Sequence, residues 1–258
     1  MKKVIVILSS SITLFAACSQ DTQEANYTRC PQANSKDVVS TVTDVDGNTY
    51  KTIKIGDNEW FASNLKTTKL NDGTPIKNIA NEKAWSEAKD AAYATYNNEE
   101  NAEVLYNWAA ASSDKLCPEG WTVPEDADWL QLAATYANVE NATGWDKVPT
   151  TIGWDASGFQ ASASGFRERN GVFYEKDKLG LWWTKNHHNE QNAMYILMKN
   201  VSTDSTKKYL GINISHIGRT AGLSVRCVLK YSADNARKEV VDTVASAIAD
   251  SLLLSAKK

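Results

Sequence analysis

The sequence has little of the residues from which common catalytic and metal sites are built. Its 258 residues include 3 histidines and 4 cysteines, and the cysteines form no Cys-x-x-Cys pair of the kind that holds zinc. It has no Gly-rich phosphate loop, no His-Glu-x-x-His motif and no nucleophile elbow with a serine triad. Acid–base catalysis would have to use carboxylates alone, as glycosidases do. We therefore predict that the protein is not an enzyme and needs no cofactor, and keep a carboxylate-based, glycan-active enzyme as the less favoured alternative.

Two short stretches resemble metal sites without completing one. Asp44, Asp46 and Asn48 imitate the start of a calcium loop, but the glycine falls two positions early and no glutamate stands at the last ligand position. His187 and His188 are neighbours in a predicted loop, and adjacent histidines rarely share one ion. We predict a β-hairpin at the first stretch and no metal at either.

Excess positive charge and long apolar runs are also lacking. The 28 Lys and Arg residues are fewer than the 31 Asp and Glu residues and form no basic run, so we expect no nucleic-acid partner. The one long apolar stretch, residues 4–17, follows Lys2 and Lys3. It is too short to span a bilayer and is typical of a signal peptide.

This stretch ends in Ala-Ala before Cys18, which is similar to a bacterial lipobox. We predict a lipoprotein signal peptide at residues 1–17 and a lipid on Cys18, with an ordinary secretory signal and a chance cysteine as the alternative. Several lipid chains make membrane anchoring effectively permanent. Ser19, rather than Asp, follows the cysteine, which by analogy with other lipoproteins favours the outer membrane. Residues 18–40 are polar and are expected to tether a domain away from the membrane.

Aromatic residues, in contrast, are plentiful. The chain has 9 Trp and 10 Tyr, which can build the core of a loop-rich fold or line a sugar-binding surface, and the core is the favoured interpretation. Residues 41–231 are long enough for one domain with a sizeable core. For residues 232–258 we predict a separate amphipathic helix, because apolar residues recur at helical spacing from Val241 to Leu252.

Residues 117–132 are typical of a strand end that turns into a helix. Pro124 suits the first helical position, because its φ is fixed near the helical value and it has no N–H. The acidic residues of the first turn, which complement the helix dipole rather than forming an acid–base pair, are Glu125, Asp126 and Asp128. The apolar residues of the predicted buried face are Trp129, Leu132, Ala133 and Tyr136.

The rest of the domain is predicted to be rich in β-strands, with a second helix over residues 81–93. Asp46-Gly47 predicts a hairpin turn within residues 42–55, and Asn170-Gly171 a type I′ turn within residues 166–174. Further strands are expected at residues 180–184, 195–199, 209–214 and 223–229. A long surface loop, of the kind that often carries function, is expected at residues 141–157.

The motif Cys-Pro-x-Gly-Trp-x-Val-Pro-x-Asp-Ala-x-Trp at residues 117–129 is similar to that of the Fibrobacter succinogenes major paralogous domain family. Other motifs of this family recur in the same order at residues 43–60, 105–108, 165–167, 182–184 and 222–228. Together they cover about three quarters of the chain. One departure is Glu125, where the family usually has a threonine as helix cap; a weaker cap costs about 1 kcal/mol.

The resemblance implies an α+β fold of the C-type-lectin-like group, with twisted antiparallel β-sheets, two flanking helices and long loops. It also implies a disulfide between Cys117 and Cys227, which would leave Cys30 free, although a bridge from Cys30 to either partner stays open. Lectins of this group hold calcium and sugar through Glu-Pro-Asn or Gln-Pro-Asp with Trp-Asn-Asp, and none of these triplets occurs here. Oxidase relatives need a reactive cysteine pair, whereas this pair is expected to be structural.

The anchor, the tether and the aromatic-rich domain together lead us to expect a surface-exposed binding or adhesion module for polysaccharide or protein. Its candidate ligand contacts are Trp145, Trp154, Trp182 and Trp183. The alternative is a structural subunit of a cell-surface assembly, docked through the helix at residues 232–258. An exposed apolar stripe on that helix would favour the assembly, and exposed tryptophans around one groove would favour glycan binding.

Overall fold

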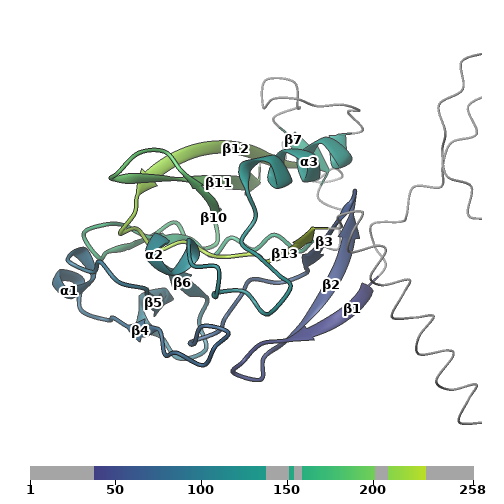
Figure 1. Cartoon of the computed structure of the whole chain (residues 1–258). Coiled ribbons are helices and arrows are strands. Elements are labelled where there is room, and N and C mark those ends of the chain that lie inside the picture. The colour runs from purple at the N-terminus through teal and green to yellow at the C-terminus, as the bar shows by residue number, and fades with distance from the viewer. Residues whose placement is uncertain (1–37, 138–150, 154–158, 201–208, 231–258) are drawn as a thin grey trace, which may run out of the picture. The chain divides into compact units, whose positions relative to one another are not determined.

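The computed structural model of the chain describes residues 38–137, 151–153, 159–200 and 209–230 (Figure 1). These residues form an α+β fold, as predicted, in which β-sheet predominates. Their helices are α1 (Glu82–Ser86), α2 (Trp108–Ala111), α3 (Asp126–Ala137) and the 3₁₀ turn η1 (Tyr96–Asn98). None of the helices within these ranges is long and apolar enough to cross a membrane. The predictions for Cys18, for Cys30 and for a helix at residues 232–258 lie outside the described residues.

The strands of the described fold are arranged in four β-sheets (Figure 1). The first sheet, in the order β1-β2-β3-β13, contains β1 (Val38–Thr43), β2 (Thr49–Ile55), β3 (Asn58–Phe61) and β13 (Val228–Lys230). The second, in the order β10-β11-β12-β7, contains β10 (Leu179–His187), β11 (Asn192–Asn200), β12 (Tyr209–Gly218) and β7 (Thr151–Gly153). The two small sheets contain β4 (Lys77–Asn78), β5 (Ala92–Thr95) and β6 (Val104–Tyr106), and β8 (Phe166–Arg167) with β9 (Phe173–Tyr174). Paired strands are antiparallel except β4 and β5.

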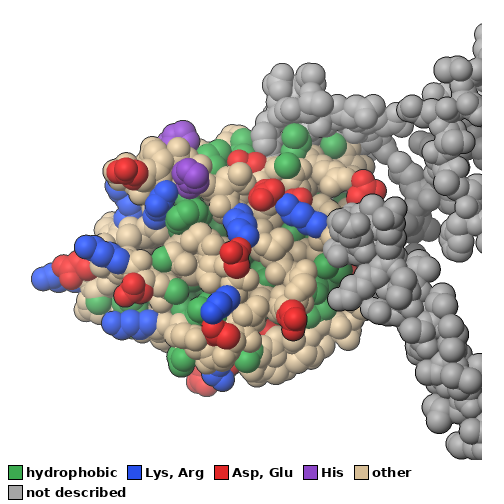
Figure 2. All heavy atoms as spheres, viewed as in Figure 1, with side chains coloured by type: hydrophobic (Ala, Val, Ile, Leu, Met, Phe, Trp, Pro, Cys, Tyr) green, Lys and Arg blue, Asp and Glu red, His purple; other side chains and the backbone are tan. Residues whose placement is uncertain are grey.

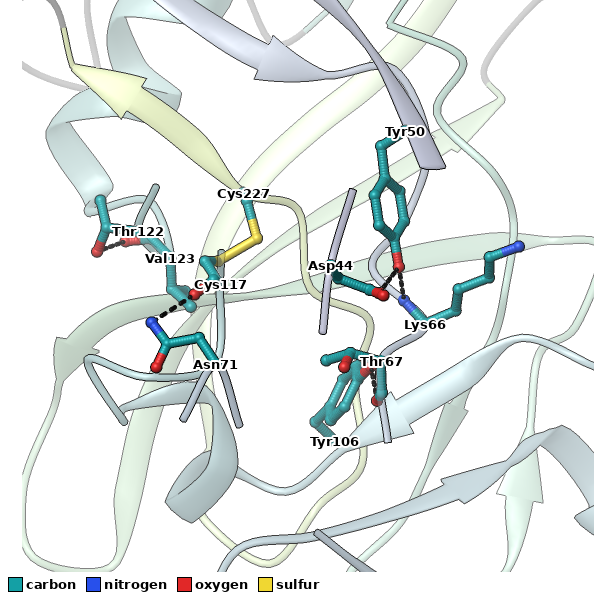
Figure 3. The surroundings of a disulfide bond; sticks show 10 residues. All are labelled: Asp44, Tyr50, Lys66, Thr67, Asn71, Tyr106, Cys117, Thr122, Val123 and Cys227. Carbon is teal, nitrogen blue, oxygen red and sulfur yellow. Dashed lines mark hydrogen bonds between the residues drawn. A yellow bond between two sulfur atoms is a disulfide. The ribbon is translucent and has the colours of Figure 1, made fainter. Parts of the chain in front are cut away.

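The first sheet brings the two ends of the described domain together. The last strand, β13, pairs with β3, so that Val228 lies opposite Trp60. The disulfide that the resemblance implied is present next to this point: Cys117 and Cys227 are bonded, with their Cα atoms 6.0 Å apart (Figure 3). Both cysteines are buried, and Asn71 donates a hydrogen bond to the Cys117 carbonyl at 3.2 Å. In the chain-entropy model, a bridge across a loop of this length stabilises a fold by roughly 3–5 kcal/mol.

Two hydrophobic clusters lie on the two faces of β10. On one face, α3 packs its Trp129 and Leu132 side chains against Trp182, in a buried cluster. On the other face, Trp183 packs in a cluster with Phe61 and residues of the surrounding loops. Neighbouring residues of a strand point to opposite faces, so the adjacent tryptophans belong to different parts of the core. The predicted buried face of α3 is confirmed at Trp129, Leu132 and Ala133.

The helix α3 begins two residues later than predicted. Glu125 takes the cap position, and its backbone N–H donates to the Asp128 carboxylate at 2.8 Å. This contact is one half of a capping box. Asn186, on β10, accepts the next free N–H, that of Asp126, at 2.9 Å. The prediction that Pro124 is the first helical residue is therefore wrong, because these two side chains cap the helix at Glu125 and Asp126.

The helix predicted over residues 81–93 is also shorter in the structure. It ends at Ser86, residues 87–91 are irregular, and the last two residues of the predicted helix, Ala92 and Tyr93, begin β5 instead. Ala92 and Ala94 are buried, while the residues between and after them are half-buried. The Ala92 N–H donates to the Asn107 side chain at 3.0 Å. This alternation is the period of a strand, and pairing with β6 outweighs the helix propensity of the segment.

Both predicted hairpins form, one of them with a different turn. The β1–β2 hairpin reverses at Asp46-Gly47, where the Asp44 carboxylate accepts the backbone N–H of Asp46 at 3.0 Å and of Asn48 at 2.9 Å. Between β8 and β9, Gly171 has φ 90°, but Asn170 has no positive φ. A type I′ turn needs positive φ at both positions, so that prediction is wrong, and a longer loop with a left-handed glycine joins the strands.

Three strands of the second sheet are longer than predicted, and the fourth, β7, lies within the loop predicted at residues 141–157, so that prediction is wrong at residues 151–153. Residues 180–184, 195–199 and 209–214 all lie within them, and β10 continues to His187, which is therefore a strand residue rather than a loop residue. The predicted last strand, residues 223–229, is shorter: Leu223 and Ser224 form isolated bridges, and regular pairing starts at Val228.

Candidate ligand-binding surface

The two predicted ligand contacts that the structure describes are buried. Trp182 and Trp183 are each 0% exposed. The Trp182 Nε1–H donates to Asn64 Oδ1 at 2.8 Å, and the Trp183 Nε1–H donates to the Tyr106 carbonyl at 2.7 Å. The prediction that these rings contact a ligand is wrong, because both faces of β10 are covered by core. The other two candidates lie outside the described residues: Trp145 and Trp154.

An exposed aromatic ring stands instead at the end of β9. Tyr174 is 42% exposed. It lies opposite Phe166 in the β8–β9 hairpin, with the two ring centroids 5.8 Å apart. Residues directly opposite each other in antiparallel strands present their side chains on one face. The hairpin therefore offers solvent an aromatic platform, with Tyr174 above a half-buried Phe166.

The backbone around this platform has an uncommon conformation. In the described residues, the non-glycine positions with left-handed φ, between 49° and 66°, are Asn97, Asn98, Asn101, Gln160, Glu175 and Asp177. Asparagine tolerates this region, whereas a glutamate there is strained. The strained turn at Glu175 is held by the Asp177 N–H, which donates to the Ala163 carbonyl at 2.8 Å. Strain of this kind clusters at ligand-binding sites, where the surrounding structure holds it in place.

Tyr96 joins these segments to one another. Its ring centroid lies 5.2 Å from that of Phe173 and 5.2 Å from the Lys176 Nζ. At Gly165, with φ 65°, an added Cβ would lie 2.8 Å from the Tyr96 ring and 2.4 Å from the Tyr174 carbonyl oxygen, so glycine is needed there. We call the exposed and half-exposed residues of these segments the Tyr174 surface: Asn97, Asn98, Asn101, Tyr174, Glu175, Lys176 and Asp177.

A polar network lies next to the same segments, inside the domain. The Asn64 side-chain nitrogen is 2.9 Å from Ser162 Oγ, 3.0 Å from Ser164 Oγ and 3.2 Å from Glu103 Oε2. Its oxygen accepts from Arg226 Nη2 at 2.8 Å. The network reaches the Tyr174 surface through Glu103. The Glu103 carbonyl accepts the N–H of Tyr96 at 2.9 Å, and Tyr96 directly precedes Asn97. These buried hydrogen bonds hold the adjacent segments in one conformation.

Arg167 fixes the β8–β9 hairpin from inside. Its buried guanidinium carbon lies 4.4 Å from the Trp85 ring centroid and 4.7 Å from the Phe173 ring centroid. It donates to three backbone carbonyls, including that of Gly171 at 2.7 Å. Burial lowers the pKa of Arg167 to about 10, although the negative charge of Glu82 acts to raise it. The side chain therefore stays protonated at neutral pH and holds the hairpin, and with it Tyr174, in place.

The Tyr174 surface is chemically mixed. It combines one exposed ring with amides, carboxylates and a lysine, which suits a ligand with apolar faces and many hydroxyl groups. Among the described residues, no three His, Cys, Asp or Glu side chains are grouped as a metal site. Sequence reasoning missed this surface, although the hairpin signal between Phe166 and Tyr174 could have placed both rings on one face.

The chain belongs to a known family. Residues 53–229, more than half of the chain, match the Fibrobacter succinogenes major domain (Fib_succ_major) family. The matched range includes the disulfide, α3 and the whole Tyr174 surface. Neither the curated proteins nor the solved structures contained a match to the chain.

Proposed function

We propose that the protein is a surface-exposed bacterial lipoprotein whose domain is a non-enzymatic binding or adhesion module, with a polysaccharide bound at the Tyr174 surface. The observation that carries this proposal is the exposed Tyr174 ring, which directly precedes the left-handed backbone of Glu175. An aromatic ring packs against the apolar faces of sugar rings, while amides and carboxylates hydrogen-bond to their hydroxyl groups.

The anchoring and the fold group are parts of the same proposal. Ala-Ala before Cys18 supports lipidation, and Ser19 supports the outer membrane as the location. We also assign the domain to the C-type-lectin-like group. The antiparallel sheets and the pairing of β13 with the early strand β3 support that assignment.

Lipidation is tested by replacing Cys18 with alanine. The wild-type protein is expected in the membrane pellet of its host, and the Cys18→Ala variant in the supernatant or unprocessed. A wild-type protein that lacks the mass of the lipid would contradict the anchor. Protease treatment of intact cells then measures whether the domain faces outward.

Binding is tested with the full-length protein in detergent on an array of polysaccharides. Tyr174→Ala is expected to lower affinity for the bound polysaccharide by about tenfold or more, the size of effect at a central aromatic contact. The matched control is Val45→Ala, because Val45 is 43% exposed on the β1–β2 hairpin and its truncation removes apolar surface elsewhere. It should leave affinity unchanged.

Three outcomes would redirect the proposal. Binding that is equally strong in wild type and Tyr174→Ala would place the polysaccharide elsewhere on the protein. A blank array would favour a protein partner and the alternative of a surface-assembly subunit docked through residues 232–258. Release of sugar fragments from a bound polysaccharide would identify a carboxylate-based enzyme instead.

A further inference from the structure

The arginines of the described residues have different surroundings. Arg167 and Arg226 are both 0% exposed, and each donates to several backbone carbonyls. Arg169 is exposed and lies 3.6 Å from the carboxylate of its neighbour Glu168. The first two serve the fold, and the third is a solvated surface charge. Arg219 fits neither description.

Arg219 is half-buried at the end of β12, and its charge is not matched by a carboxylate. Its guanidinium carbon lies 4.4 Å from the centroid of the Trp108 ring, and its Nη2 donates to the Asn189 carbonyl. No described Asp or Glu forms an ion pair with it. Its Nε–H is buried without an acceptor. An arginine that served stability alone would satisfy that group, as Arg167 does with the Gly171 carbonyl.

The position of the Arg219 side chain is fixed through the backbone. The Arg219 carbonyl accepts the Trp108 N–H at 3.0 Å, and its own N–H donates to the Gln191 carbonyl at 3.0 Å. It is thereby tied both to α2 and to the turn between β10 and β11. The Nε–H is buried and one Nη2 N–H donates to Asn189. The N–H groups of Nη1 and the second one of Nη2 remain, and in a guanidinium held in one orientation on an aromatic ring they form a fork for an oxyanion.

A pair of stacked histidines lies at the same end of the second sheet. His188, next to Asn189 in the turn, stacks on His216 of β12, with ring centroids 4.0 Å apart and planes 6° apart. Both are exposed. Parallel rings aim their nitrogens along parallel planes rather than at one point, which suits hydrogen bonding to a ligand better than chelation of an ion. In Figure 2, histidine side chains lie close to Lys or Arg side chains on the visible face of the described fold. The acidic residue of the turn, Glu190, is exposed and forms no ion pair with described residues.

The β8–β9 hairpin connects this corner to the Tyr174 surface. At its turn, the Arg169 side chain covers Gly218, where an added Cβ would lie 2.1 Å from Arg169 Cδ. At its other end stands Tyr174. With about 3.3 Å per strand residue, the hairpin spans on the order of 10 Å between the two. That length corresponds to a few linked sugar units, so one extended polymer can contact both places.

We infer that Arg219, held over the Trp108 ring, forms a second contact site that binds the anionic group of an acidic polysaccharide. The anion is a carboxylate or a sulfate, either of which accepts two parallel N–H bonds from one guanidinium. This inference rests on the proposed function, since it takes the polymer at the Tyr174 surface to continue along the hairpin. It adds the chemical class of that polymer.

The test compares four polymers on the full-length protein in detergent. Alginate carries carboxylates, dextran sulfate carries sulfates, dextran is neutral, and poly-L-glutamate is an acidic peptide. Wild type is expected to bind at least one of the two acidic polysaccharides at least tenfold more tightly than dextran, and the arm that binds identifies the anion. The protein's own net charge of −3 works against unspecific binding of polyanions.

The variants separate a specific contact from a general charge effect. Arg219→Gln is expected to lower affinity for the acidic polysaccharide by at least tenfold, and Arg219→Lys by less, since it keeps the charge but not the fork. The control Lys115→Gln removes one positive charge from an exposed residue that pairs with Asp72, and should change affinity by less than twofold. Thermal melting of each variant checks that it is folded, and Arg219→Lys serves if Arg219→Gln is not.

The following outcomes would overturn the Arg219 site, the polymer assigned to it, or the proposed function as well. The Arg219 site would be overturned if Arg219→Gln and Lys115→Gln lowered affinity for the acidic polysaccharide equally, or if neither lowered it. Poly-L-glutamate bound as tightly, with the same dependence on Arg219, would make it an acidic-peptide site and overturn the assignment to polysaccharide. Binding of dextran alone, lost in Tyr174→Ala, would overturn this inference and leave the proposed function standing. No binding of any polysaccharide here or on the array would overturn both.

Discussion

The region beneath α3 and the Tyr174 surface use aromatic residues in opposite ways. Beneath α3, Trp60, Trp129 and Trp182 are fully buried, and the Trp129 ring lies 5.0 and 6.0 Å from the other two. All three come from regular helix or strand. At the Tyr174 surface, the ring is exposed and the adjacent Glu175 has a left-handed backbone. Tyr174 is also a strand residue, so the comparison shows that the packing on each face, rather than aromatic content, decides whether a ring is buried or exposed.

The largest effect is expected on the buried side of this comparison. Trp129→Ala should lower the free energy of unfolding by about 3–5 kcal/mol, because it removes a large side chain from a closed cluster. Urea denaturation followed by circular dichroism measures the loss, and Trp129→Phe, which leaves a smaller void, should lose less. A loss below about 1 kcal/mol would show that the cluster closes without this ring.

The glycine beneath the Tyr174 surface comes next. Gly165→Ala should destabilise the fold by roughly 2–4 kcal/mol, because alanine is strained at φ 65° and its Cβ would clash with backbone. Gly120→Ala is the matched control. Gly120 has φ 82° with nothing within 4 Å of an added Cβ, so only the strain of about 1–2 kcal/mol is expected. If Gly165→Ala and Gly120→Ala lowered the free energy of unfolding equally in thermal or urea unfolding, the Tyr96 and Tyr174 segments would be able to move apart and make room for the added Cβ.

A titration extends the comparison to the β1–β2 hairpin. Burial alone would raise the pKa of Asp46, but hydrogen bonds from Lys69 and Thr68 prevail and lower it from 3.8 to about 2. A lowered pKa in the folded state stabilises above about pH 4, and this contribution is lost as the pH falls toward 2. We expect wild type to lose about 2 kcal/mol more than Asp46→Asn between pH 5 and pH 2. Parallel curves for the two proteins in acid unfolding would contradict the role of this carboxylate.

The smallest effect on stability is expected at the exposed ring. Tyr174→Ala should change the free energy of unfolding by less than about 0.5 kcal/mol, as exposed positions usually do, while it removes polysaccharide binding. The same urea titration used for Trp129→Ala measures it. A loss of 2 kcal/mol or more would show that Tyr174 supports the fold, and its effect on binding would then be indirect.

Part of the fold follows from local sequence pattern. The spacing of Trp129, Leu132 and Ala133 predicts the buried face of α3, and Asp46-Gly47 predicts the first hairpin, because both signals depend on neighbours in the chain. The pairing of Cys117 with Cys227 follows only from the resemblance to a family, since spacing alone leaves Cys30 as a competitor.

The candidate surface was harder to predict, because long-range packing determines it. No local sequence pattern shows that both faces of β10 are covered. The sequence therefore predicts ligand contacts at Trp182 and Trp183, where the structure has buried core. The hydrogen bond from Trp182 to Asn64 joins residues 118 positions apart. The left-handed conformation of Glu175 has no sequence signal either, since glutamate is not a residue that favours it. Tyr174 could be placed on a hairpin face from sequence, but its exposure could not.

The disulfide has a consequence for a protein held under tension. It closes a covalent loop from Cys117 to Cys227 that contains Tyr174 and Arg219. A pulling force applied at the two ends of the described domain, Val38 and Lys230, would load β1, an edge strand that can peel from β2 one hydrogen bond at a time. Because the backbone between the two cysteines is bypassed by the S–S bond, that force does not stretch it. The segment that contains Tyr174 and Arg219 is therefore not extended when the domain is pulled at its two ends.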